Sequence, residues 1–533
     1  MVAKEDTHVI RKNTRTVKSI ALAGLGILAV AAGLSGQAPI EAQDGGGNGP
    51  LIAPAAVMTA SPQIRTAADM RAAAAAQALA ASGSLPPFLP TVSAAQYAAQ
   101  KAAAAAAAPR GRAPAEVLAP SVLAPTLQFI NFEGLGPPTS LAPSDSHGAV
   151  GHIQYVEVVN TTIRVYTKGN PAVSQPTVVT TSTLQAFFGT SETLFDPRAI
   201  YDPNWQRWIV LATRHSTSVS DPSAFFELAV SQTNDASGSW CIAQIGLGGT
   251  PGQWLDYPQL GQDQDGIIVT GNLFSGADAF IAARLISLSK ARLFNCLSFS
   301  FPVFGGLVGT LAPPIVRDGN PAATLLAANG GTVQKYSLTS SSRAPATLTG
   351  PVAITGPAAW TVPPDAPQLG TTTLLDTLDG RFVNASTQVG NEVWNTHTVN
   401  NGGIAGVRWY RIDHVTNAVV QQGIIPGGSN YLFNASIAVN DALNAFMTYS
   451  MSSAALRPQV RYTGKLSAAV SIPFGTSLVS SPNVFTGVTV ARWGDYSAVS
   501  IDPSDTTKAW IVNQYVGGAS QFNWRTRIAR IGQ

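Results

Sequence analysis

The chain has 533 residues, of which 45% are hydrophobic and 11% are charged. The charged fraction lies well below the roughly 25% of an ordinary soluble protein, which excludes a charged disordered chain, a coiled coil and a protein that coats nucleic acid. The 32 basic and 29 acidic side chains leave a net charge of +3, which is too balanced to predict a nucleic-acid partner. Two cysteines are too few for a disulfide scaffold or a multi-cysteine zinc site.

Residues 1–42 have the order of a secretory signal peptide. A positive segment precedes an uncharged apolar run over residues 19–34, and small residues follow it. The basic residues are Arg11, Lys12, Arg15 and Lys18, and the candidate cleavage sites follow Ala38 and Ala42. We therefore expect a secreted, periplasmic or cell-surface protein with no membrane span after cleavage; the alternative is a retained anchor, for which the run is short.

Residues 43–126 are biased towards alanine, proline and glycine. Alanine runs at 72–76 and 102–108 favour helix, but they carry no apolar stripe and are interrupted or followed by proline. We predict a low-complexity spacer with short, marginal helices. The alternative is a stalk that spans the cell envelope.

Residues 127–533 change to strand-forming composition and contain a repeat. The unit is an apolar strand, a tight polar turn and a second apolar strand, with turn-to-turn intervals of 51 to 64 residues. Each interval holds the hairpin and about two further strands, as in a β-propeller built of four-stranded antiparallel blades. The turns lie at Gly151, Asp202, Asp263, Asp318, Asp376, Asn440 and Asp502.

This repeat predicts an all-β, seven-bladed β-propeller. Six blades are the alternative, since the copy at Asp318 is weak, and a pair of β-sandwiches is the rival architecture. The strand-like segments 127–134 and 524–532 lie at the two ends of the region, and we expect them to share one closing blade.

Four aspartates precede the first strand of their units: Asp145, Asp196, Asp256 and Asp495. In equivalent blades they would lie at one mouth of the central channel, where carboxylates could bind a polar ligand or a divalent cation such as Ca²⁺. The alternative is that each accepts hydrogen bonds from its own loop. An EF-hand at Asp263 is excluded, because Gly261 and Asn272 stand where acidic ligands are needed.

Aromatic side chains flank these aspartates, and an aromatic face beside a carboxylate suits sugar binding. The alternative is that the aromatic rings pack between blades. The candidate ligand-binding residues are Asp145, His147, Asp196, Asp256, Tyr257, Arg492, Trp493, Asp495 and Tyr496. No metal site or cofactor is otherwise expected.

The two cysteines, Cys241 and Cys296, could form one disulfide in an exported protein or remain two buried thiols. The segment 231–240 just before Cys241, SQTNDASGSW, resembles the Asp-box turn of sialidase-type propellers, with its glycine displaced. In those proteins that turn is architectural and joins two outer strands.

Several longer segments carry a family resemblance: PSDSHGAVGHIQYVEVVN (143–160), DPRAIYDPNWQRWIV (196–210), LLDTLDGRF (374–382), RWGDYSAVSIDPSD (492–505) and WRTRIARIG (524–532). On the strength of these segments, the region 127–533 resembles a family of exported bacterial β-propellers that is distantly similar to BNR or sialidase-like repeat proteins. The resemblance implies the fold and export. It implies no activity, because none is established for that family.

The catalytic motifs that we sought are missing from the sequence. It has no FRIP-like arginine motif, for which PRAI (197–200) is a poor substitute, and no GxSxG, HExxH or CxxC. We therefore expect a monomeric, non-catalytic propeller that binds a glycan or a surface partner through one face. The alternatives are a glycoside hydrolase that uses acids among the four aspartates, and a structural envelope component.

Overall fold

The computed structural model describes residues 49–76, 85, 87–107, 124–137, 141–170, 172–215 and 224–533. The predicted signal peptide, residues 1–42, lies outside the described residues. Within the described part of the chain, no helix is both long and apolar enough to cross a membrane.

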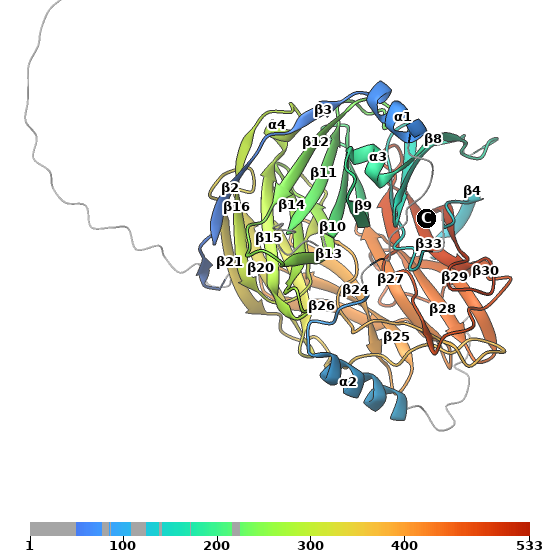
Figure 1. Cartoon of the computed structure of the whole chain (residues 1–533). Coiled ribbons are helices and arrows are strands. Elements are labelled where there is room, and N and C mark those ends of the chain that lie inside the picture. The colour runs from blue at the N-terminus through green and yellow to red at the C-terminus, as the bar shows by residue number, and fades with distance from the viewer. Residues whose placement is uncertain are drawn as a thin grey trace, which may run out of the picture. The chain divides into compact units, whose positions relative to one another are not determined.

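The first three series of strands each form an antiparallel hairpin meander, and the last strand of each lies farthest from the axis (Figure 1). The first series is β5 (His147–Val150), β6 (Gln154–Val159), β7 (Thr162–Thr167) and β8 (Val178–Thr183). The second is β9 (Thr193–Asp202), β10 (Arg207–His215), β11 (Phe225–Ser231) and β12 (Trp240–Gly246). The third is β13 (Trp254–Gln262), β14 (Gly266–Phe274), β15 (Phe280–Ser289) and β16 (Phe299–Leu307).

Four further series follow in chain order. They begin with β17 (Leu311–Ala312), β18 (Pro314–Val316), β19 (Ala323–Asn329), β20 (Thr332–Thr339) and β21 (Thr347–Ala353). The fifth series is β22 (Leu374–Leu375), β23 (Ser386–Val389), β24 (Glu392–Asn400), β25 (Ala405–Asp413) and β26 (Ala418–Ile424). The sixth series is β27 (Tyr431–Val439), β28 (Ala445–Ser453), β29 (Leu456–Lys465), β30 (Thr476–Ser480) and β31 (Val490–Ala491). The last series is β32 (Ala498–Ile501), β33 (Lys508–Val516) and β34 (Trp524–Gly532), completed by β4 (Thr126–Glu133).

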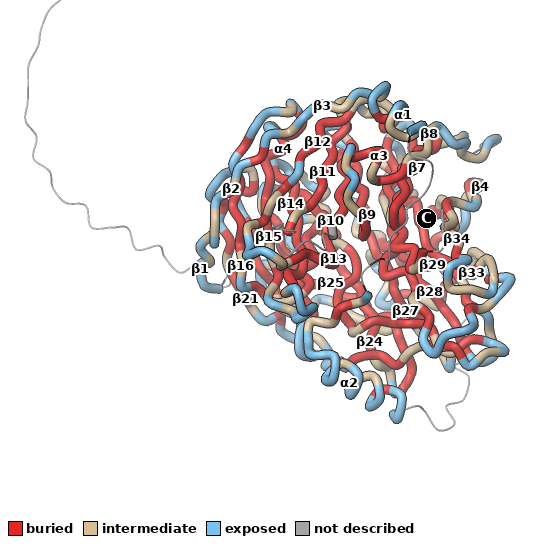
Figure 2. Tube along the Cα trace, viewed as in Figure 1, coloured by how far each residue is buried: buried red, intermediate tan, exposed pale blue. Residues whose placement is uncertain are grey.

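The innermost strands contact one another in chain order and close a ring. β5 contacts β9, β9 contacts β13, β23 contacts β27, β27 contacts β32, and β32 returns to β5. Between β13 and β23, the short strand β18 pairs in parallel with both. This closed radial order is an all-β propeller, in which neighbouring sheets bury one another's faces. Figure 2 shows the inner strands as buried.

The prediction of seven separate, equivalent four-stranded blades is wrong, and so is the alternative of six. Among the described residues, five separate sheets have four or five strands, and a two-stranded sheet pairs β22 with β31. The third series and the series β23–β26 are joined through β18 into one ten-stranded sheet. The weak copy at Asp318 explains the difference, because its innermost segment is split into two short strands, β17 and β18, that pair with different neighbours.

The apolar core lies between neighbouring sheets. One cluster joins the second and third series and includes Ile209, Phe226, Leu255, Ile267 and Phe301. A second cluster joins the first and second series around Trp208 and Trp240. Large buried side chains of this kind contribute about 1.5–3 kcal/mol each through burial, so these interfaces hold the ring together.

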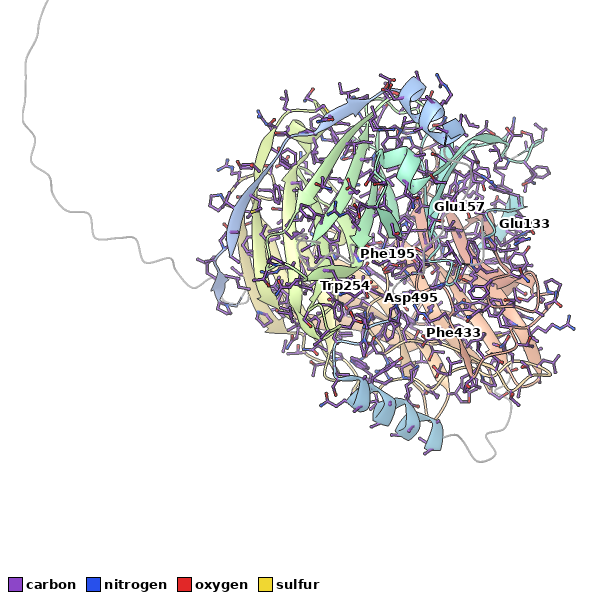
Figure 3. The ribbon with its side chains drawn as sticks, in the orientation of Figure 1. Glu133, Glu157, Phe195, Trp254, Phe433 and Asp495 are labelled. Atoms are coloured by element: carbon purple, nitrogen blue, oxygen red, sulfur yellow. A yellow bond between two sulfur atoms is a disulfide. The ribbon has the colours of Figure 1, made fainter. Side chains whose placement is uncertain are left out.

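The two ends of the region 127–533 meet in one sheet, as predicted. β34 pairs antiparallel with β4, with Ile528 opposite Phe132. The buried carboxylate of Glu157 on β6 accepts from Thr526 Oγ1 on β34 at 2.5 Å and from Tyr166 at 2.6 Å. Glu157 and Glu133 lie in this region in Figure 3. Main-chain pairing and a buried carboxylate thus link the first and last sheets.

Part of the predicted spacer belongs to the sheets. β1 (Leu51–Ile52) pairs with β21, β2 (Ala56–Ala60) with β16, and β3 (Gln63–Arg65) with β12. α1 (Ala67–Ala76) then contacts α3 (Leu184–Phe188). The blue segment in Figure 1 follows the outer edges of these sheets. β1, β2 and β3 form because the edge strands of three sheets are available for pairing. The alanine-rich composition of this segment does not predict that.

A disulfide joins Cys241 on β12 to Cys296, which follows the short helix α4 (Lys290–Leu293). The Asp-box-like turn lies between β11 and β12, where Asp235 Oδ1 accepts from the amide of Ser237 at 2.9 Å and Trp240 is buried. The disulfide and the turn both stabilise outer strands and lie away from the axis.

Candidate functional site

Five non-glycine residues with positive φ lie near the start of an inner strand or in the segment just before it. These are Asp145 (43°), Asp196 (51°), Tyr257 (57°), Leu378 (60°) and Asn434 (47°). Asp and Asn tolerate this conformation, whereas Tyr and Leu adopt it at a cost of about 1–3 kcal/mol. Bulges in the pairing of β9, β13 and β27 accompany it. The backbone is therefore held in an unusual form where the strands enter the ring.

The four predicted aspartates come together at what we call the acidic end: Asp196 lies in β9, Asp256 lies in β13, and Asp145 and Asp495 lie in the segments just before β5 and β32. All four are buried, and they line one small cavity of about 10 Å³ together with Arg492. The amide of Asp495 donates to Asp145 Oδ1 at 2.8 Å, and Tyr496 donates its hydroxyl to Asp196 Oδ2 at 2.5 Å. Residues from different sheets therefore converge at the axis.

Three arginines stand among these carboxylates. Arg492 donates to Asp376 at 2.9 Å and to Asp495 at 3.1 Å. Arg381 forms a two-pronged ion pair with Asp379 at 2.7 and 2.8 Å. These pairs neutralise part of the local negative charge, and removing one partner of such a buried pair is strongly destabilising.

Arg198 is held by main-chain and amide oxygens instead of a carboxylate. It donates to Pro258 O at 2.9 Å and to Asn384 Oδ1 at 3.0 Å, and its guanidinium lies 3.4 Å from the ring centroid of Tyr496. Tyr496 in turn meets Tyr257 edge to face, with ring centroids 5.0 Å apart. Arg198 and the two tyrosines form a rigid centre beneath the aspartates.

The N-terminal segment closes this end of the axis. We call residues 85 and 87–107 the cover. Phe88 lies 4.7 Å from the guanidinium of Arg381 and 5.4 Å from that of Arg492. The buried side chain of Leu89 packs with Phe195 and Trp254, and its carbonyl accepts from Arg381 at 3.1 Å. Figure 3 shows Phe195, Trp254 and Asp495 near the centre of the molecule.

The helix α2 (Ala94–Ala106) extends the cover. Ser93 and Gln96 form a capping box at its first turn, which fixes where the helix begins. Lys101 pairs with Asp365 at 2.6 Å and donates to Thr377 at 3.0 Å. Most of the other side chains of α2 are exposed, as Figure 2 shows. The cover is thus attached mainly at Phe88, Leu89 and Lys101.

Burial changes how the aspartates titrate. Burial, and then the neighbouring Asp196, raises the pKa of Asp145 to about 8. Burial also raises the pKa of Asp495 to about 7, although Arg492 opposes the shift. The pKa values of Asp196 and Asp256 are raised for the same primary reason. Near neutral pH these carboxyls can therefore hold protons and donate hydrogen bonds.

Two of the predicted site residues lie elsewhere. Trp493 is buried against Phe433 and Phe485, and its indole donates to Ser450 Oγ at 3.0 Å, so it packs the core. His147 lines a separate pocket at the other end of the inner strands. Burial, and then Arg198, lowers the pKa of His147 well below its usual value.

Sequence reasoning missed Arg381, Phe88 and Lys101. A signal for Arg381 was present, because Asp379-Gly-Arg381 repeats the Asp196-Pro-Arg198 pattern at the start of another unit. Phe88 and Lys101 lie in biased sequence that gives no indication of contact with the axis. Among the described residues, no three or more His, Cys, Asp or Glu side chains are grouped so as to hold a metal ion.

No protein-family model and no curated protein matches the chain. Solved structures that resemble it include a Dos1 propeller, at 8% identity and a TM-score of 0.35, over 71% of this chain and 75% of that one. Another is a subtype N10 neuraminidase-like protein of A/little yellow-shouldered bat/Guatemala/060/2010, at 10% identity and a TM-score of 0.33, over 65% of this chain and 99% of that one. A third is an exo-β-1,3-galactanase from Phanerochaete chrysosporium, at 10% identity and a TM-score of 0.31, over 77% and 96%. Propeller and sialidase-like structures are thus among those similar to this chain.

Proposed function

We propose that this chain is an exported, non-catalytic β-propeller that binds a glycan through its acidic end when the cover moves away. The proposed ligand-binding residues are Asp145, Asp196, Asp256, Arg492 and Asp495, with Tyr257 and Tyr496 beneath them. The observation that carries the proposal is the convergence of four buried carboxyls and two arginines under a cover fixed by few side chains. Buried ionisable groups are costly, and such groups with shifted pKa values concentrate at functional sites.

The position of Phe88 indicates what the acidic end accepts. Its ring presents a flat apolar surface to the guanidinium groups of Arg381 and Arg492. The C–H face of a pyranose has a similar shape, and its hydroxyls could pair with Asp145 and Asp495 directly below. A glycan would therefore replace the cover, with carboxyls and guanidiniums supplying the hydrogen bonds that fix its orientation.

Export is part of the proposal, and the disulfide supports it. The disulfide Cys241–Cys296 is of the kind that persists in oxidising compartments outside the cytosol. The basic and apolar order of residues 1–42 adds sequence support. Mass measurement of the protein from its native host would show a mature chain beginning after Ala38 or Ala42, whereas a chain that retains residues 1–42 would refute cleavage.

The test uses an uncovered variant, Phe88→Ala with Leu89→Ala, on a glycan array. Its matched control is Phe522→Ala with Leu369→Ala, which truncates two partly exposed side chains away from the axis. The proposal expects glycan signals at least 10-fold stronger for the uncovered variant than for the wild type, with the control equal to the wild type. Equal signals for all three proteins would refute binding at the acidic end.

A glycoside hydrolase is the second candidate, and the raised pKa values favour it. A glycosidase needs one carboxyl that stays protonated near neutral pH and a second carboxylate near it. Asp145 and Asp495 have pKa values of about 8 and 7 in the covered chain, and they would meet the first requirement where a bound glycan excludes water as the cover does. Turnover of the array glycan by the uncovered variant, abolished by Asp495→Asn without loss of binding, would establish this candidate. Binding without turnover would favour the non-catalytic propeller.

A further inference from the structure

A second pocket, with a volume of about 260 Å³, lies at the opposite ends of the inner strands. The strand β9 shows that it is separate from the acidic end: Asp196 lines the small cavity there, whereas Ala199 and Asp202 line this pocket. We call it the axial pocket. Asn204 and Asp441, in the turns after β9 and β27, are exposed residues of its lining and mark its open end. No described residue of the cover lines it.

His147 presents a hydrogen-bond donor at the inner end of the axial pocket. It is the first residue of β5, close to Asp145 in the chain, and it is a partly exposed residue of the pocket lining. Its Nδ1 accepts from the amide of Ala199 at 3.3 Å, so the proton of the neutral ring is on Nε2. Nε2 has no hydrogen-bond partner among the described residues and keeps accessible surface. An N–H group therefore faces the pocket.

Ser436 adds a hydroxyl group at the same level of the axis. Ser436 on β27 and His147 on β5 each stand two positions after a residue with positive φ, Asn434 and Asp145 respectively, where the inner strands enter the ring. Ser436 lines the pocket, and its Oγ has no hydrogen-bond partner among the described residues but keeps accessible surface. Two inner strands thus offer unused donors at the inner end.

The walls between the inner end and the open end are largely aliphatic. Ile200 on β9, Ile437 on β27 and Val499 on β32 line them. Strands of the ring rather than one loop carry these side chains, so the pocket is preformed. Concave sites with apolar walls and a few polar groups are the usual form of small-molecule sites.

The acidic residues of the lining lie away from His147. Asp202 ends β9, Asp263 follows β13 and Asp441 follows β27, so all three are at the turn ends of their strands. Asp202 pairs with Lys290 at 2.6 Å. Asp263 uses Oδ1 to accept from turn amides, and its Oδ2 is shielded from solvent. No carboxylate of the lining therefore opposes an anion at the inner end.

A positive charge lies next to the inner end. Arg198 precedes Ala199 in β9 and forms no ion pair among the described residues, since oxygens of Pro258, Asn384 and Val383 hold its guanidinium. Burial, and then the charge of Arg198, lowers the pKa of His147 well below its usual value. The field that disfavours a second proton on the ring favours an anion beside it.

We propose that the axial pocket binds a small organic monocarboxylate, with the carboxylate at His147 Nε2 and Ser436 Oγ and the apolar body between the aliphatic walls. Both groups donate to carboxylate oxygens, and the charge of Arg198 offsets part of the cost of burying the anion. The volume lies just below the ~300–1,000 Å³ of drug-sized ligand sites, which suits a molecule of about the size of benzoate or hexanoate. A neutral ligand gains nothing from the charge of Arg198, and an ammonium group is repelled by it.

The test is ligand-observed NMR and calorimetric titration of the full chain with benzoate and hexanoate. Benzyl alcohol and benzylamine are the neutral and cationic probes of matched shape. The variants are His147→Asn, which keeps an acceptor for the amide of Ala199 but does not reach the position of Nε2, and Ser436→Ala. Their matched controls are His414→Asn and Ser300→Ala, at two residues outside the pocket lining. Circular dichroism and the Tm verify that each variant folds.

The proposal expects a carboxylate to bind more tightly than benzyl alcohol and benzylamine. It expects about 10-fold weaker binding in His147→Asn, a smaller loss in Ser436→Ala and no change in the two controls. No binding of either carboxylate at ~10 mM would overturn it, as would equal or tighter binding of the neutral or cationic probe.

Three further variants locate the carboxylate. Loss of binding in Arg317→Gln, with His147→Asn and Ser436→Ala unchanged, would place it at the open end and overturn the proposal. The uncovered variant, Phe88→Ala with Leu89→Ala, should bind benzoate as the wild type does. Stronger binding in the uncovered variant would place the carboxylate at the acidic end and would also overturn the proposal, so this result is separate from the test of glycan binding.

Discussion

The backbone amide of Asp495 donates to Oδ1 of Asp145 at 2.8 Å, although 350 residues separate them. Asn160 Nδ2 donates to Oδ2 of the same carboxyl at 2.5 Å. Asp145 therefore joins the loop before the last sheet to the first sheet, and it does so at the axis. One buried side chain both helps to close the ring and lines the acidic end.

Asp145→Ala should destabilise the protein much more than Asp145→Asn. Alanine leaves the amide of Asp495 unpaired and removes one of the two acceptors of Asn160 Nδ2, which keeps its bond to Pro143 O; this costs about 1–3 kcal/mol in the free energy of unfolding. Asparagine keeps an acceptor at Oδ1 for the amide of Asp495 and loses the bond to Asn160 Nδ2 alone. It also replaces a carboxyl whose pKa of about 8 already favours the neutral form at pH 7. Chemical denaturation at pH 7 measures both values. Equal losses in the two variants would contradict the role given to this bond.

The cover should open as the pH rises. Covered, Asp145 and Asp495 have pKa values of about 8 and 7; uncovered and hydrated, they should approach the usual aspartate value of about 3.9. A group whose pKa is raised in the covered state favours closure most when it is protonated in both states, which is the case below pH ~4. As the pH rises from there towards 7 or 8, the free energy of closure becomes less favourable by up to ~1.4 kcal/mol per carboxyl for each pH unit.

The groups that face these carboxyls are Arg492, Arg381, Asp376, Asp196, Asp256 and Tyr496. Limited proteolysis of residues 87–107 between pH 4.5 and 8.5 measures the opening. We expect cleavage to become faster with pH after correction for the intrinsic activity of the protease. Slower cleavage at high pH would contradict the coupling between closure and protonation.

Loss of the disulfide should lower the free energy of unfolding by an amount that the length of its loop predicts. The bond closes a loop over a sequence separation of 55 residues, for which loop entropy predicts about 4 kcal/mol in the free energy of unfolding. Cys241→Ser with Cys296→Ser should show this loss in urea denaturation, with no change in glycan binding by the uncovered variant. A loss below ~1 kcal/mol would show that the surrounding strands hold Cys241 and Cys296 in place without the bond.

The hairpins at Gly151, Asp202, Asp263, Asn440 and Asp502 could be predicted from sequence because their signals are local. The turn predicted at Asp376 is wrong: Asp376 follows β22 and pairs with Arg492 at the acidic end, and the hairpin of that series joins β23 to β24 after Val389. Asp202 accepts from the amides of Asn204 and Trp205 at 2.9 and 3.0 Å, as an Asp in a tight turn should. The gathering of the four aspartates followed from the repeat, since equivalent positions in successive units meet at the axis. The blade count failed at β17 and β18: β17 pairs with β19 of its own series, whereas β18 pairs with β13 and β23 of the neighbouring series.

The cover could not be predicted, because nothing local marks it. Phe88 stands between prolines in a biased segment, and its partners are distant in the sequence or in the helix that follows: the guanidiniums of Arg381 and Arg492, the ring of Tyr97, and the cluster around Tyr257 and Tyr496. The strand β2 could not be predicted either. Its five residues form a strand because they pair with the main-chain groups at the edge of β16. Contacts made across the whole chain length leave no periodic trace in the sequence.

The central claim is that a glycan and the cover compete for the acidic end. Hydrogen exchange of residues 87–107 in the wild-type protein, with and without the glycan found by the array, tests it most directly. Competition predicts faster exchange in this segment when the glycan is bound, together with slower exchange at Tyr496 and its neighbours. Unchanged or slower exchange of residues 87–107 at saturating glycan would contradict the claim.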